Sequence, residues 1–163
     1  MLSLKKILCP TDFSKLSLIA LEGANDLALQ YSSELYVVNV VPPIPLLPAD
    51  TELAAEFGVS LYEAELRLSA EKSLQDLVEQ KVSKELQVHP IAVHGDPPYA
   101  IVEIADREKV DLIVITTHGR RGWRQLAFGS VAQKVIRITH CPVLLIPAPH
   151  EEGSIAAATS ANP

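Results

Sequence analysis

The sequence predicts an α/β fold, in which one sheet of five parallel strands carries helices on both of its faces. Short apolar stretches alternate with longer stretches whose apolar residues recur at helical spacing, a pattern typical of parallel sheets. The stretch 111–116 is rich in β-branched apolar residues, the composition of a strand buried on both faces. A chain of 163 residues suffices for one domain with its own core, expected over residues 1–147, and leaves no room for a second.

The periodicity also gives approximate positions for each element. Strands are expected at residues 5–10, 35–41, 86–93, 111–116 and 143–146, and helices over about 20–31, 60–78, 97–105 and 130–138. Four prolines between residues 42 and 48 make that stretch a stiff, extended loop. Ser60 and Glu63 have the spacing of a capping box, which predicts that Ser60 caps the second helix. Asp96 as N-cap and Pro97 at the first helical position start the third helix.

One proline and two loops predict the order of the strands. Pro90 falls within the third strand, and a proline is tolerated there if the strand lies at an edge of the sheet. The first strand ends at Pro10, before Thr11 and Asp12, and the fourth ends at Thr116. Ligands of open parallel sheets bind outside the carboxyl ends of the strands, where the strand order reverses. The order 3-2-1-4-5 brings both loops over one crevice and puts the third strand at an edge.

The loop after the fourth strand has the features of a phosphate-binding segment. Nine residues separate Gly119 from Gly129, and Ser130 follows at once and opens a helix. A strand, a glycine loop and a helix N-terminus aim backbone N–H groups and the positive end of the helix dipole at one point. The Ser130 hydroxyl could cap the helix or donate to a phosphate oxygen. Glycines in turns and an ordinary serine cap explain the same residues without a ligand, so the context has to decide.

The charge of the chain limits its partners. A formal net charge of −6 argues against nucleic acid, because binding to a phosphate backbone requires clustered positive charge. Arg120, Arg121 and Arg124 nevertheless lie within the glycine loop, where they favour a polyphosphate ligand over a merely solvated surface. The longest apolar runs have the length of strands, so we expect no membrane association and a cytoplasmic protein.

Cysteine and histidine spacings predict no metal centre. Cys9 and Cys141 lie in apolar surroundings without redox or zinc spacing, and both are expected to be buried thiols. The five histidines show no paired ligand spacing, and His118 alone falls near the glycine loop. Residues 148–163 consist mainly of small and polar residues with proline, which predicts a disordered C-terminal tail.

Several short motifs together make the chain resemble the universal stress protein family up to Pro147. Nucleotide-binding members of this family carry the motif G-x2-G-x9-G-[ST]. The sequence matches it at Gly119, Gly129 and Ser130, whereas Thr116 occupies the position of the first glycine. The other matching segments are residues 10–12, 39–42 and 141–145, at the ends or start of predicted strands.

The resemblance implies a Rossmann-like fold of the adenine nucleotide alpha hydrolase type, bound ATP with Mg²⁺, and a homodimer joined through the last strand, Val143–Ile146. It implies that the adenosine part contacts Asp12 and the backbone of Val40, with Ile115 and Thr116 lining the crevice. The phosphates would be held by Gly119, Gly129, Ser130 and the N–H group of Val131. Pro10, Thr11, Arg120 and Gly122 complete the candidate site. Asp12 could instead cap the first helix or a turn beside Ser14.

Three functions remain open at this point. The favoured one is a regulatory module of the stress response in which bound ATP biases dimer geometry or the choice of an unidentified protein partner. The second is a weak ATPase, although no Walker-type lysine follows the glycines, and His118 and Asp12 are the only candidate bases. The third is a dimeric interaction module that binds no nucleotide. The nucleotide content of the purified protein would separate the third from the others, and a turnover assay would separate the first two.

Overall fold

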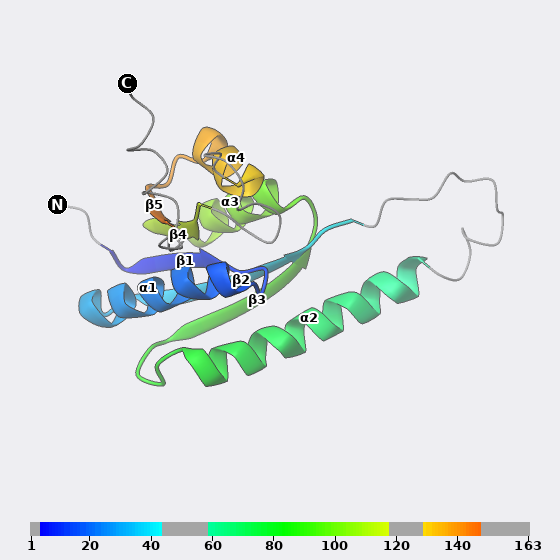
Figure 1. Ribbon diagram of the computed structural model, residues 1–163, viewed down its shortest axis with the longest axis horizontal. Coiled ribbons are helices and arrows are strands. Elements are labelled where there is room, and N and C mark those ends of the chain that lie inside the picture. The colour runs from blue at the N-terminus through cyan, green and yellow to red at the C-terminus, as the bar shows by residue number, and fades with distance from the viewer. Residues whose placement is uncertain (1–3, 44–58, 118–128, 148–163) are drawn as a thin grey trace, which may run out of the picture.

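The computed structural model describes residues 4–43, 59–117 and 129–147 (Figure 1). Its elements, in chain order, are β1 (Lys6–Pro10), α1 (Lys15–Tyr31), β2 (Glu34–Val41), α2 (Val59–Lys81), β3 (Val88–His94), α3 (Pro97–Glu108), β4 (Leu112–Thr116), α4 (Ser130–Ile138) and β5 (Val143–Ile146). The strands form one sheet in the order β3-β2-β1-β4-β5, and all four neighbouring pairs are parallel. The predicted fold class and strand order are therefore confirmed.

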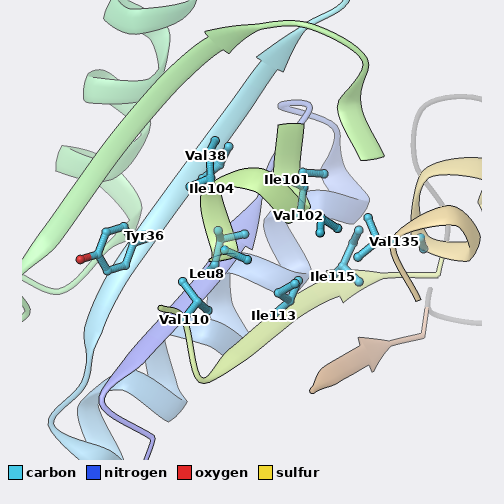
Figure 2. Close-up of a cluster of buried hydrophobic side chains, with 12 residues drawn as sticks. Leu8, Tyr36, Val38, Ile101, Val102, Ile104, Val110, Ile113, Ile115 and Val135 are labelled. Atoms are coloured by element: carbon cyan, nitrogen blue, oxygen red, sulfur yellow. The ribbon is translucent and has the colours of Figure 1, made fainter. Parts of the chain in front are cut away.

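Helices cover both faces of this sheet, as Figure 1 shows, and each face has its own apolar cluster. Successive residues of a strand point to opposite faces, so neighbours such as Ile7 and Leu8 enter different clusters. The cluster under α1 and α2 includes Ile7, Cys9, Leu35, Val37, Leu74 and Val114. The cluster under α3 and α4, drawn in Figure 2, includes Leu8, Val38, Ile101, Ile113, Ile115 and Val135. The two layers fix both sides of the central strands β1 and β4.

Pro90 lies in the edge strand β3, as predicted. The N–H group of Leu35 donates to the carbonyl of Gln87 at 2.9 Å, and the N–H group of Gly95 donates to the carbonyl of Val41 at 3.0 Å. Odd-numbered residues of β3 therefore turn their backbone groups toward β2, and even-numbered residues turn theirs outward. The N–H group that Pro90 lacks would point away from β2, so the proline removes no hydrogen bond from the sheet.

Several predicted boundaries need correction. Ser60 does not cap α2, because the helix already includes Val59 and Ser60 lies inside it. Asp96 is the N-cap of α3 and Pro97 follows it as predicted, but the Asp96 side chain makes no capping hydrogen bond. The other elements begin or end within a few residues of the predictions, except that α1 starts five residues earlier, at Lys15. Pro45, Pro48 and the predicted tail, 148–163, lie outside the described residues.

Among the residues that the structure describes, no helix is both long enough and apolar enough to cross a membrane.

Candidate functional site

The candidate site lies at the carboxyl ends of β1 and β4. These two strands pair in the centre of the sheet, with Ile7 opposite Leu112 and Leu8 opposite Ile113. The chain leaves β1 to build the β2 and β3 side, and it leaves β4 to build the β5 side. The loops that follow the two strands consequently emerge at the same edge, at the point where the strand order reverses. The fold thus brings together the two segments that carry the candidate residues.

A tight turn connects β1 to α1 and holds Asp12 in place. The N–H group of Thr11 donates to the carbonyl of Val38 at 2.8 Å, which extends the contact between β1 and β2 by one residue. The next residues form the turn, in which Phe13 has a left-handed φ of 61°. The N–H group of Ser14 donates to Oδ1 of Asp12 at 3.0 Å. Ser14 is the N-cap of α1, so Asp12 closes the turn and does not cap the helix.

Three buried polar side chains surround this turn. Thr11, Ser17 and Asn39 are only 5%, 4% and 6% exposed, and all of them are hydrogen-bonded. The hydroxyl groups of Thr11 and Ser17 lie 3.0 Å apart, and the Asn39 amide donates to the carbonyl of Thr11 at 2.8 Å. Sequence reasoning gave Ser17 no role and gave Asn39 none beyond its place in a family motif. A serine on the buried face of a helix and an asparagine within an apolar strand were the available signals.

The ends of β1, β2 and β4 supply the walls beside the turn. Pro10 and Val40 are half-buried, whereas Ile115 and Thr116 are buried. Thr116 pairs with Ile146 of β5, and the N–H group of Thr117 donates to the carbonyl of Ile146 at 3.1 Å. Thr116 occupies the position of the first glycine of the family motif. It is thus buried at the end of β4, with 7% of its surface exposed.

The N-terminus of α4 lies at the same edge, because the N–H group of Gly129 donates to the carbonyl of Thr117. Gly129 is the N-cap, and Ser130 is the exposed first residue of the helix. Of the two roles left open for the Ser130 hydroxyl, helix cap or donor to a phosphate oxygen, the cap position is thus occupied by Gly129. The first intrahelical hydrogen bond runs from the N–H group of Gln133 to the carbonyl of Gly129 at 3.0 Å. The N–H groups of the three preceding residues, which include Val131, have no partner carbonyl within the helix.

The middle of the glycine loop falls outside the described residues. This applies to three candidate site residues, Gly119, Arg120 and Gly122, and also to His118, Arg121 and Arg124. The sequence therefore remains the basis for every assignment to these positions.

The prediction that both cysteines are buried thiols is confirmed for Cys9 and only in part for Cys141. Cys9 is fully buried in β1, and burial raises the pKa of its thiol to about 12. Cys141 is half-buried before β5; desolvation is the main cause that raises the pKa of its thiol to about 11, and its Sγ lies 3.2 Å from the carbonyl oxygen of Val110. Among the described residues, no group of three or more histidine, cysteine or acidic side chains is arranged to hold a metal ion.

Comparison with known proteins identifies the family. A family model described as the universal stress protein family matches residues 3–147. The chain belongs to this family. It is 34% identical over 148 residues to universal stress protein MJ0531 of Methanocaldococcus jannaschii, with 91% of this chain and 85% of the relative covered.

Solved structures of relatives share the fold. The structure of MJ0577, from the same organism, superposes with a TM-score of 0.78 at 28% identity and covers 91% of this chain and 99% of its own. A universal stress protein of Archaeoglobus fulgidus, solved in complex with dAMP, superposes with a TM-score of 0.53 at 24% identity. That comparison covers 90% of this chain and 99% of the other. These comparisons and the observed sheet confirm the resemblance and the Rossmann-like α/β fold.

Proposed function

We propose that this universal stress protein is a dimeric regulatory protein that binds ATP together with Mg²⁺ and acts in the cytoplasm. The observation that carries the proposal is the meeting of two segments at one edge of the sheet. The Asp12 turn follows β1, the N-terminus of α4 is tied to the end of β4 through Gly129 and Thr117, and β1 and β4 are neighbours. A carboxylate and a helix N-terminus at one edge of the sheet suit the two ends of a nucleotide.

The residues of the site divide between the two ends of ATP. On the adenosine side we assign Asp12 and the backbone of Val40, with Pro10, Thr11, Ile115 and Thr116 as the surrounding wall. On the phosphate side we assign Gly119, Arg120, Gly122, Gly129, Ser130 and the N–H group of Val131. Since Ser130 does not cap α4, its hydroxyl is assigned to a phosphate oxygen.

The chemistry of the described residues fits this ligand. The first turn of α4 presents N–H groups that the helix does not use, and these groups favour phosphate oxygens. No cluster of metal-ligating side chains is found in the described part of the chain. Mg²⁺ would arrive on the phosphates of ATP, because this ion is commonly held by one or two protein carboxylates together with the substrate phosphates. The dAMP complex of the Archaeoglobus fulgidus relative supports an adenine nucleotide.

We assign ATP a regulatory role. The Asp12 carboxylate accepts the N–H group of Ser14 and closes a turn, a role that favours binding over proton transfer.

The dimer is assigned to β5, because this strand lies at the edge of the sheet and consists of apolar residues, Val143–Ile146. Pairing with a second copy would satisfy the backbone groups on its outer side. The protein partner that the bound state would select is unidentified.

Two measurements test the proposal. Mass analysis of small molecules released from the purified protein should detect an adenine nucleotide, and calorimetric titration of nucleotide-free protein with Mg-ATP should give a saturable heat. Asp12→Ala should weaken this binding. A protein that releases no nucleotide, gives no heat and shows no thermal shift at millimolar Mg-ATP would leave the dimeric interaction module as its function.

A further inference from the structure

We infer that Ser17 and Asn39 are positioning residues that hold the Asp12 turn in the shape that the nucleotide requires. The inference rests on the proposed function and deepens it, because neither side chain is assigned to the ligand. Both side chains are buried and both bond to the turn that presents Asp12. They come from different elements, α1 and β2, so the turn is held from two directions.

The turn contains a conformation that its sequence does not favour. Phe13 has a φ of 61°, in the left-handed region that residues other than glycine seldom adopt. Two hydrogen bonds bracket this residue. The N–H group of Phe13 donates to Oγ1 of Thr11 at 3.1 Å, and the N–H group of Ser14 donates to Oδ1 of Asp12 at 3.0 Å. The hydrogen bonds on both sides of Phe13 hold this residue in the left-handed conformation.

The hydroxyl groups of the turn are linked to one another. The Ser17 hydroxyl lies within hydrogen-bond distance of two groups of the turn, the carbonyl of Ser14 at 2.9 Å and Oγ1 of Thr11 at 3.0 Å. The Thr11 oxygen in turn accepts the N–H group of Phe13. Ser17 therefore orients the Thr11 hydroxyl, and through it the peptide that follows Asp12.

Asn39 fixes the other side of the turn. Its side-chain amide donates to the carbonyl of Thr11 at 2.8 Å, while the N–H group of Thr11 donates to the carbonyl of Val38 at 2.8 Å. Both backbone groups of Thr11 are thus tied to β2, and its hydroxyl is tied to α1. The peptide that leads into Asp12 has little freedom left. A carboxylate held in this way binds a ligand without first having to order its own loop.

The first experiment compares single variants by calorimetric titration with Mg-ATP. Ser17→Ala should weaken binding about tenfold, the equivalent of one hydrogen bond, and Asn39→Leu should weaken it at least as much. Ser33→Ala is the matched control. Ser33 is 3% exposed and its hydroxyl also donates to a backbone carbonyl, that of Leu4, but it lies at the amino end of the sheet. It should lower the thermal midpoint and leave the affinity unchanged.

The second experiment asks whether Ser17 acts through the turn. In protein that already carries Asp12→Ala, adding Ser17→Ala should cause no further loss of affinity, because the group that Ser17 positions is gone. Thr11→Val should reproduce the loss, because valine keeps the shape of threonine but lacks the hydroxyl that links Ser17 to the turn. Without any nucleotide, amide exchange at Phe13 should be faster in Ser17→Ala than in the parent, and unchanged in Ser33→Ala.

The outcomes separate this inference from the proposed function. A parent protein that binds no Mg-ATP overturns the proposed function and the inference with it. A parent that binds, together with Ser17→Ala of unchanged affinity, overturns the inference alone. Additive losses in the double variant would also overturn it, because they would mean that Ser17 and Asp12 act separately.

Discussion

Replacing Gly129 by valine should separate nucleotide binding from stability. Gly129 has φ of −52° and ψ of 141°, a conformation that valine adopts without strain, and it caps α4 with no side-chain contribution. The loss of stability should therefore be about 1 kcal/mol, the usual scale of an unfavourable N-cap, or roughly 2–4 °C in the thermal midpoint. The effect on affinity should be far larger. Displacing phosphate from two backbone N–H groups removes about 3–6 kcal/mol, roughly a hundredfold to ten-thousandfold in Kd.

The assay is calorimetric titration with Mg-ATP, paired with thermal unfolding in the absence of nucleotide. Gly23→Ala is a suitable glycine control, because the added Cβ in α1 would meet Cδ1 of Ile146 at 3.6 Å, an ordinary van der Waals contact. This control should bind like the parent and be equally or more stable. A folded Gly129→Val protein with the parent affinity would refute the phosphate assignment. A variant that fails to fold would refute the account of the helix start.

Three further predictions concern the edges of the sheet and the buried thiol. Leu144→Lys should give a monomer by light scattering, because Leu144 is an exposed apolar side chain of β5. A variant that keeps the mass of a dimer would show that β5 does not form the interface. Pro90→Val should produce larger assemblies at high concentration, because it restores an outward N–H group on β3; a mass equal to that of the parent would show that the edge is blocked otherwise. Burial raises the pKa of Cys9 to about 12, so its thiol ionises first in the unfolded chain. The free energy of unfolding should thus fall by about 1.4 kcal/mol per pH unit between about 9 and 12, and denaturant titrations should show a smaller loss for Cys9→Ala.

The sequence predicted the fold well because the relevant signals are local. Alternation along β1 sends Ile7 and Leu8 into different apolar clusters, and this period survives in any short window of sequence. Pro90 marked an edge strand because a proline cannot donate to a neighbour. The strand order then followed from the rule that places ligand loops at a reversal of the sheet.

The two helix starts, at Ser60 and at Ser130, were misread for different reasons, one local and one distant. Ser60 and Glu63 have capping-box spacing, but residues three apart are also neighbours within a helix, so the spacing alone does not mark its start. Ser130 was expected to be a possible cap, yet α4 is capped by Gly129, whose N–H group bonds to Thr117 across the glycine loop. No local pattern records that contact.

The support of the Asp12 turn was missed for a similar reason. Thr11, Ser17 and Asn39 come from a strand end, a helix and a neighbouring strand, and their hydrogen bonds form only when the sheet is assembled. Each of them is an unremarkable residue in its own element. Sequence reasoning also gave Gly95 no role. This residue joins β3 to α3 beside Val41 at the same edge of the sheet, and its φ of 155° suits glycine.

The geometry at Thr117 connects the proposed nucleotide site with the proposed dimer strand. The N–H group of Thr117 bonds to the carbonyl of Ile146, the last residue of β5, and its carbonyl accepts the N–H group of Gly129 at the start of α4. One residue thus joins the helix end assigned to phosphate with the strand assigned to the partner copy. A ligand that draws the first turn of α4 toward itself would act on β5 through these two hydrogen bonds. Because linkage is reciprocal, any factor by which ATP strengthened the dimer would equal the factor by which dimerisation strengthened ATP binding. A regulatory role for the nucleotide thus requires no active-site chemistry, only a difference in affinity for ATP between the monomer and the dimer.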